Sequence, residues 1–180
     1  MSRPGTFAAM SRLDIPLETA VRTADAAATR RLGALLAPVA EAGDLIALWG
    51  DLGAGKTQFA KGFGAGLGVE DTVTSPSFVL MAEYEGRLRL FHQDLYRLAD
   101  ASDALAGGLV DDRQEIGVTL VEWPDRMGTA LPLARLDVRI AGAGDEPRTI
   151  TIRATDPRYR RFITAAAGVA AARPVGSADR

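Results

Sequence analysis

The segment Gly50-Asp51-Leu52-Gly53-Ala54-Gly55-Lys56-Thr57 is the most informative part of this chain. It fits G-x-x-x-x-G-K-[ST], a loop whose backbone N–H groups and lysine cradle phosphates. The chain contains two lysines, Lys56 and Lys61, and one of them stands where the pattern requires it. The alternative is a glycine-rich turn between a strand and a helix with no ligand. The flanking residues favour the phosphate loop.

Those flanks predict a strand, a loop and a helix in that order. Asp44–Trp49 is a short apolar run, typical of a strand buried on both faces of a parallel sheet. Residues 57–67 place apolar side chains at helical spacing, although Gly62, Gly64 and Gly66 each weaken that helix by about 1 kcal/mol relative to alanine. These glycines suggest close packing on the sheet. The loop amides and the positive end of the helix would then face one anion together.

Length and composition favour one globular domain. The chain has 180 residues and 47% hydrophobic residues, and we expect a domain over 12–164 with flexible tails at 1–11 and 165–180. A net charge of −2 argues against binding nucleic acid by charge alone, so no direct DNA binding is expected. The absence of cysteine excludes disulfides and zinc–thiolate sites. No apolar run resembles a membrane helix or signal core, which predicts a cytoplasmic protein.

Other segments predict an α/β fold. Helices are expected from a cap at Thr23 to about Ala37 with an apolar stripe, over 99–105, and from about 157 onward. The stripe of the first helix comprises Leu32, Leu35, Leu36 and Val39. Strands are expected at 78–81, 88–91, 118–121, 136–140 and 149–152, the first two and the last two pairing as hairpins. The predicted fold is P-loop NTPase-like: a mixed, mostly parallel sheet flanked by helices, with an antiparallel C-terminal hairpin and the ligand at the carboxyl ends of strands.

Phosphoryl chemistry on ATP needs few protein groups. Lys56 should reach the β- and γ-phosphates, and the Thr57 hydroxyl should bind Mg²⁺. Magnesium also needs a nearby carboxylate. Two acids follow buried strands: Glu122 ends the run 118–121, and Asp94 follows 88–93. Either one can equally be a solvated loop residue or a helix cap.

Three further positions each allow two interpretations. Ser75 and Ser77 flank Pro76 in a polar loop, where they would contact the γ-phosphate or simply form an ordinary turn. His92, the sole histidine, is more typical of a structural imidazole than of a catalyst. Trp123 would stack on a base or pack in the core.

With these residues placed, the chain resembles the bacterial TsaE family, the ATPase subunit of the tRNA threonylcarbamoyladenosine biosynthesis machinery. The resemblance covers about residues 29–152 and rests on four blocks in order. They are the phosphate loop 50–57, Thr74-Ser75-Pro76-Ser77-Phe78, His92-Gln93-Asp94-Leu95-Tyr96-Arg97-Leu98, and Val121-Glu122-Trp123-Pro124-Asp125-Arg126 followed by Leu131-Pro132. Four ordered blocks are far more specific than any one of them.

The resemblance implies a role for each matching residue. Lys56 and Thr57 keep the roles given above, Glu122 becomes the second Mg²⁺ contact, Asp94 serves hydrolysis, and Trp123 lies near the nucleotide. The residues expected at the nucleotide are Asp51, Leu52, Gly53, Ala54, Gly55, Lys56, Thr57, Gln58, Ser77 and Trp123. Gln58 replaces a threonine common in the family, which puts any role of that hydroxyl in doubt. Ser77 replaces the switch-loop threonine and keeps its hydroxyl.

The resemblance also implies partners. The family member binds TsaD and TsaB and hydrolyses ATP so that their catalytic cycle turns over, which predicts weak ATPase activity for the isolated chain. Contact with tRNA is left open.

Three rival functions are weighed against this one. A small-molecule kinase would need a lid with arginines. Arg158, Arg160 and Arg161 lie close together far downstream, and a solvated charged face explains them as well. A GTPase would commonly carry Asn-Lys-x-Asp, which neither lysine can provide. A nucleotide-gated binding module without turnover has the same binding residues.

Overall fold

A computed structural model describes residues 17–76, 80–98, 115–144 and 146–171. The strands are β1 (Glu18–Thr23), β2 (Asp44–Trp49), β3 (Met81–Tyr84), β4 (Arg89–Asp94), β5 (Gly117–Glu122), β6 (Leu136–Ala141) and β7 (Arg148–Ala154). The helices are α1 (Ala26–Leu36), α2 (Lys56–Gly66) and α4 (Arg160–Ala171), with 3-10 segments η1 (Ala37–Val39), η3 (Pro124–Ala130) and η4 (Pro157–Tyr159). The expected helix at 99–105 and part of the expected strand at 78–81 lie outside the described residues.

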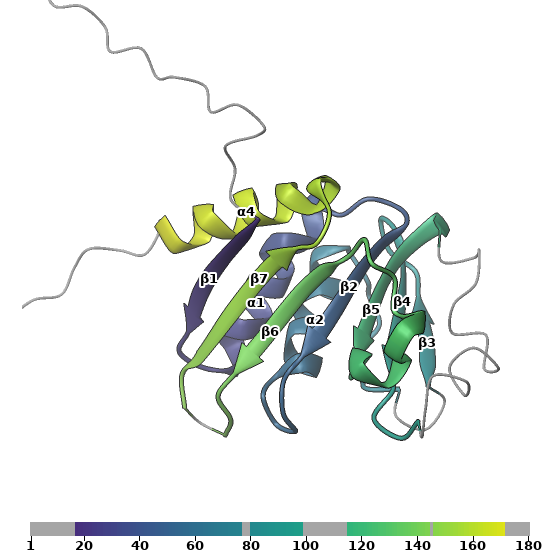
Figure 1. The fold of residues 1–180 in the computed structure, drawn as a ribbon, viewed down its shortest axis with the longest axis horizontal. Coiled ribbons are helices and arrows are strands. Elements are labelled where there is room, and N and C mark those ends of the chain that lie inside the picture. The colour runs from purple at the N-terminus through teal and green to yellow at the C-terminus, as the bar shows by residue number, and fades with distance from the viewer. Residues whose placement is uncertain (1–16, 77–79, 99–114, 145, 172–180) are drawn as a thin grey trace, which may run out of the picture.

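The strands form one twisted sheet in the order β1-β7-β6-β2-β5-β4-β3 (Figure 1). The pairs β2–β5, β2–β6 and β4–β5 are parallel, whereas β1–β7, β6–β7 and β3–β4 are antiparallel. The expectation of a mostly parallel sheet was therefore wrong. Parallel pairing is confined to the centre, because β1, β7 and β3 each run against their neighbours.

Helices α1 and α2 pack behind the strands in Figure 1, and α4 runs along the upper end of β1 and β7, where it also contacts α1. Alternate strand residues meet Phe59 and Phe63 of α2 and Phe162 of α4 in the main core. A smaller apolar cluster on the other face joins η3 to β5 through Met127 and Val121. The central strand β2 is thus covered on both sides, as its apolar run predicted.

Glycines bring α1 and α2 into backbone contact. A Cβ on Gly62 would lie 1.9 Å from the Arg30 carbonyl oxygen, and one on Gly66 would lie 2.5 Å from that of Ala34. Only Gly64 faces the sheet side, where a Cβ would lie 2.6 Å from Val73 Cγ2 and 3.3 Å from Leu90. The expectation of packing on the sheet holds for Gly64 and was wrong for the other two, which serve the contact between helices.

The start and the buried stripe of the first helix differ from expectation. Thr23 ends β1 rather than capping a helix, and Asp25 caps α1 by accepting a hydrogen bond from the Ala28 amide at 2.6 Å. Leu35 is 53% exposed, so it does not belong to the buried stripe. The helical segment expected from about 157 is present as η4 and then α4, which runs through Ala171.

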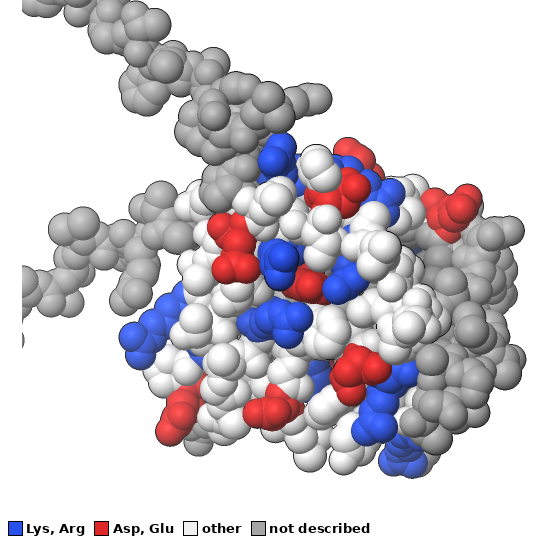
Figure 2. All heavy atoms as spheres, in the orientation of Figure 1, with Lys and Arg blue, Asp and Glu red and all other residues white. Residues whose placement is uncertain are grey.

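The face of the sheet opposite the helices carries both signs of charge. In Figure 2 acidic and basic side chains are interspersed across this face, with no continuous basic stripe. Within the described ranges, no helix is long and apolar enough to cross a membrane.

Candidate functional site

The phosphate-loop sequence forms the connection between β2 and α2. Gly50 has a φ of 143°, and a Cβ there would lie 2.5 Å from the Ile140 carbonyl oxygen, so both the conformation and the space require glycine. Gly55, with a φ of 114°, is the N-cap of α2. Lys56 and Thr57 therefore begin the helix, where unpaired backbone N–H groups concentrate positive potential.

Lys56 lies across the loop. Its Nζ donates to the Gly50 carbonyl at 2.6 Å and to the Asp51 carbonyl at 2.9 Å, and it lies 3.8 Å from the centre of the Trp123 ring. Burial lowers the pKa of Lys56, while nearby carboxylates, led by Glu122 and then Asp94, oppose the shift. The loop thus holds a largely desolvated ammonium group among acceptors.

The two candidate acids end neighbouring strands. Strands β4 and β5 are parallel, and their register pairs Asp94 with Glu122. The Thr57 hydroxyl donates to the Glu122 carboxylate, at 2.9 Å from Oε1 and 3.1 Å from Oε2. A hydroxyl and a carboxylate this close are oxygen donors of the kind Mg²⁺ prefers. The residues present therefore fit the ion that the sequence predicted, and Glu122 is the acid whose carboxylate accepts from Thr57.

Asp94 has different partners. Its Oδ2 accepts a hydrogen bond from the Ser75 hydroxyl, and its Oδ1 accepts one from the Tyr96 amide at 3.1 Å. Ser75 comes from the polar loop before β3, so this bond ties that loop to the end of β4. Ser77 lies outside the described residues.

Trp123 turns the chain sharply after Glu122. Its backbone adopts the left-handed conformation, φ 60° and ψ 51°, which is unusual for a bulky residue and costs on the order of 1–3 kcal/mol. This turn places the Trp123 ring over Lys56 and 5.0 Å from the Tyr96 ring. Both aromatic rings line the same pocket, so the pocket offers aromatic surface beside the ammonium.

A pocket of about 300 Å³ gathers these groups. It is lined by Leu52, Gly53, Gly55, Lys56, Thr57, Gln58, Ser75, Asp94, Tyr96, Glu122 and Trp123. Of the expected nucleotide residues, Ala54 instead buries its side chain in the core. Asp51 contributes its carbonyl to Lys56, and Gln58 accepts a hydrogen bond from Arg30 of α1 at 2.7 Å.

Arg148 is a supporting residue that sequence reasoning missed. This buried arginine donates to the Ala54 carbonyl of the loop at 3.2 Å and to the carbonyls of Gly144 and Glu146 in the β6–β7 turn. Through these hydrogen bonds Arg148 connects the phosphate loop to the β6–β7 turn. The alternation of the strand could have revealed it, because Arg148 stands two residues before Ile150 and four before Ile152, on the face of β7 that is buried.

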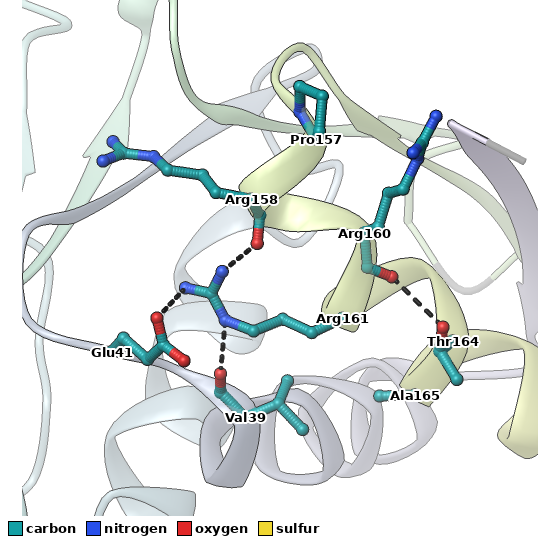
Figure 3. Close-up of a pocket in the computed structure, with 8 residues that line it drawn as sticks. All are labelled: Val39, Glu41, Pro157, Arg158, Arg160, Arg161, Thr164 and Ala165. Carbon is teal, nitrogen blue, oxygen red and sulfur yellow. Dashed lines mark hydrogen bonds and ion pairs between the residues drawn. The ribbon is translucent and has the colours of Figure 1, made fainter. Parts of the chain in front are cut away.

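The downstream arginines line a separate pocket of about 820 Å³ (Figure 3). Arg161 points to its centre, where it donates to the Val39 carbonyl at 2.8 Å and pairs with Glu41 and Asp44. Arg158 and Arg160 extend away in opposite directions. No phosphate-loop residue lines this pocket, so these arginines do not form the lid that a kinase would need.

Comparison with known proteins identifies the family. The profile described as "Threonylcarbamoyl adenosine biosynthesis protein TsaE" matches residues 23–150. This chain belongs to the TsaE family. The match includes every described element from α1 to β6 and all the residues that line the pocket at the phosphate loop.

Individual TsaE relatives align over most of their length. "tRNA threonylcarbamoyladenosine biosynthesis protein TsaE" of Bacillus subtilis is 45% identical over 139 residues, 77% of this chain and 87% of that protein. Its counterpart in Treponema pallidum is 39% identical over 124 residues, 69% and 92% of the two chains. The crystal structure of Bacillus subtilis YdiB is similar with a TM-score of 0.69 and 37% identity, covering 84% of this chain and 95% of that one.

Proposed function

We propose that this chain is the Mg²⁺-dependent, ATP-binding and ATP-hydrolysing subunit of the tRNA N6-threonylcarbamoyladenosine biosynthesis complex. The observation that carries the proposal is the joining of a phosphate-loop sequence to an adjacent hydroxyl–carboxylate pair, Thr57 and Glu122. The relatives named for this biosynthesis support the pathway. A P-loop NTPase fold is part of the same proposal.

Each residue has a defined task. The loop amides of 51–57 and the Lys56 ammonium would bind the triphosphate, whose oxygens would replace the Gly50 and Asp51 carbonyls as acceptors. Thr57 and Glu122 would hold Mg²⁺, which neutralises developing phosphate charge when bound. Asp94, beside the Ser75 hydroxyl, would orient the attacking water. Trp123 and Tyr96 would limit solvent access.

The proposed dependence of hydrolysis on partner proteins rests on the small number of metal ligands among the described residues. Among the described residues no group of three or more His, Cys, Asp or Glu side chains could hold a metal ion, so we propose that Mg²⁺ takes few ligands from these residues. Such an ion depends mainly on nucleotide oxygens and water. We therefore propose slow hydrolysis by the isolated chain and a changed rate when TsaD and TsaB are bound.

Phosphate release measured with Mg²⁺ and ATP, with and without TsaD and TsaB of the same organism, tests the function. We expect slow release of ADP and phosphate by the chain alone and a different rate with partners. A phosphorylated small molecule as product would instead identify a kinase. Nucleotide binding without turnover in either mixture would identify a binding module.

The variant Glu122→Ala tests the magnesium assignment in the same assay. Hydrolysis should fall by at least about tenfold, equivalent to 1.4 kcal/mol in the barrier, while ATP binding without metal changes little. The matched control is Asp125→Ala, which removes a nearby exposed carboxylate outside the pocket. Unchanged hydrolysis in Glu122→Ala would refute the assignment.

A further inference from the structure

His92 is fully buried and bonded at both ends of its ring. Its Nδ1 lies 3.1 Å from the Thr74 carbonyl oxygen, and its Nε2 lies 2.9 Å from Glu122 Oε1. The Thr74 carbonyl oxygen can only accept, so a hydrogen bond there places a hydrogen on Nδ1, and Nε2 faces the Glu122 carboxylate at hydrogen-bond distance. Although it faces Glu122, His92 does not line the nucleotide pocket.

We propose that His92 is a positioning residue that orients the Glu122 carboxylate and couples it to the backbone before Ser75. This inference rests on the proposed function, because only there is Glu122 assigned to Mg²⁺. Of the two Glu122 oxygens, Oε1 accepts from both Thr57 and His92. With Thr57 as its sole partner, the carboxylate could rotate about the Cγ–Cδ bond of Glu122. The contact with His92 therefore fixes its orientation.

The same contact links the polar loop to both acids. Thr74 is bound through its carbonyl to His92 and thereby to Glu122, and the next residue, Ser75, donates to Asp94. The Thr74 amide is held in turn by the Tyr84 hydroxyl at 3.2 Å. Any displacement of residues 74–75 must therefore break these bonds or move the two carboxylates together.

Packing alone does not account for this arrangement. His92 shares one face of β4 with Leu90 and Asp94, and it sits between the core and the pocket. Any buried imidazole needs partners for its nitrogens, but here one partner is the same Glu122 oxygen that accepts from Thr57 at the pocket. The two contacts can be separated, because asparagine carries an amide near the Nδ1 position and glutamine reaches the Nε2 position.

Histidine NMR tests the geometry without any variant. The chain has one histidine, so ¹⁵N-histidine labelling gives one set of ring signals. In the metal-free protein we expect a protonated Nδ1, and on adding Mg²⁺ and ATP a larger shift at Nε2 than at Nδ1. The inference would be overturned if Nδ1 carried no hydrogen. It would also be overturned if the Nε2 chemical shift stayed unchanged in protein that calorimetry shows to bind Mg²⁺·ATP. Failure of the wild type to bind Mg²⁺·ATP would instead overturn the proposed function.

Two substitutions test the role of each contact. His92→Asn should weaken the apparent affinity for Mg²⁺ in the presence of ATP by about 10- to 100-fold. Metal-free ATP binding should change by less than about twofold, since no phosphate contact is lost. His92→Gln should retain most of the Mg²⁺ affinity. Equal loss in both variants, or parallel loss of metal-free binding, would show that the residue is only structural.

Discussion

At the residue scale, burying the charged Lys56 side chain lowers the stability of the folded protein. Because burial lowers its pKa below 10.5, the folded state holds this proton less tightly than the unfolded state does. The unfolded chain then binds more protons between the lowered pKa and 10.5, so stability rises with pH across that interval. Under the proposed function, the charge is retained because the phosphates of the nucleotide would need it.

This sign gives a prediction for Lys56→Met. Relative to the variant, the wild type should gain unfolding free energy as the pH rises toward 10.5 and then level off. Urea unfolding of both proteins at several alkaline pH values measures the difference. A flat difference between wild type and Lys56→Met would mean that its ammonium is not destabilised by burial.

Asp94 should matter for turnover rather than binding. Asp94→Asn keeps an oxygen for the Tyr96 amide and turns an NH2 toward the Ser75 hydroxyl, which can accept from it, but removes the charge that would orient water. We expect ATP affinity within about threefold of wild type and hydrolysis lowered about a hundredfold or more. Fluorescence titration and phosphate release separate the two. Equal loss of affinity and rate would assign Asp94 a structural role.

At the element scale, the contact between α1 and α2 sets where Lys56 and Thr57 stand. Gly62 puts the two backbones so close that no side chain fits between them. Gly33 contributes from the other helix, since a Cβ there would lie 2.4 Å from the Phe59 carbonyl oxygen. These glycines lower the helix propensity of α1 and α2 but allow the two helix backbones to approach each other closely.

The substitution Gly62→Ala separates packing from propensity. Propensity alone would stabilise α2 by about 1 kcal/mol, but the clash with the Arg30 carbonyl should destabilise the protein by about 2–3 kcal/mol. Gly168→Ala in α4 is the matched control, because nothing lies within 4 Å and a gain of up to about 1 kcal/mol is expected. Chemical denaturation measures both, and a stabilised Gly62→Ala would contradict the helix contact.

At the scale of the whole molecule, an ion pair fastens the C-terminal helix to the central strand. Arg161 of α4 donates to both oxygens of Asp44 at the start of β2, and Asp44 also accepts from the Glu41 amide at 2.8 Å. Asp44 is buried, whereas Arg161 is 20% exposed. This pair connects residues 117 positions apart.

Breaking the pair between Arg161 and Asp44 should lower the unfolding free energy of the protein. Asp44→Ala should cost about 2–3 kcal/mol of unfolding free energy, somewhat less than a fully buried pair because water reaches the guanidinium. Glu85→Ala, which breaks an exposed pair with Arg89, should cost less than about 1 kcal/mol. Comparable losses in the two variants would show that the α4 connection contributes little.

Local sequence predicted the parts of the fold that depend on short-range pattern. The apolar run 44–49, the loop and the helix after it were confirmed, as were strands around 118–121, 136–140 and 149–152. Strand β1 was missed because ETAVRT is short and polar and buries only Val21 and Thr23. An edge strand of this kind is specified by its partner β7 more than by its own residues.

The sequence by itself determined the phosphate-loop segment, its acids and its family resemblance, because these follow from residue type and spacing along the chain. Only the tertiary structure decided the antiparallel flanks of the sheet, the pairing of Asp94 with Glu122, and the contacts of His92 and Arg148. The physical reason is that strand register and buried hydrogen bonds join residues far apart in the chain, and such pairs leave no periodic trace in either segment alone.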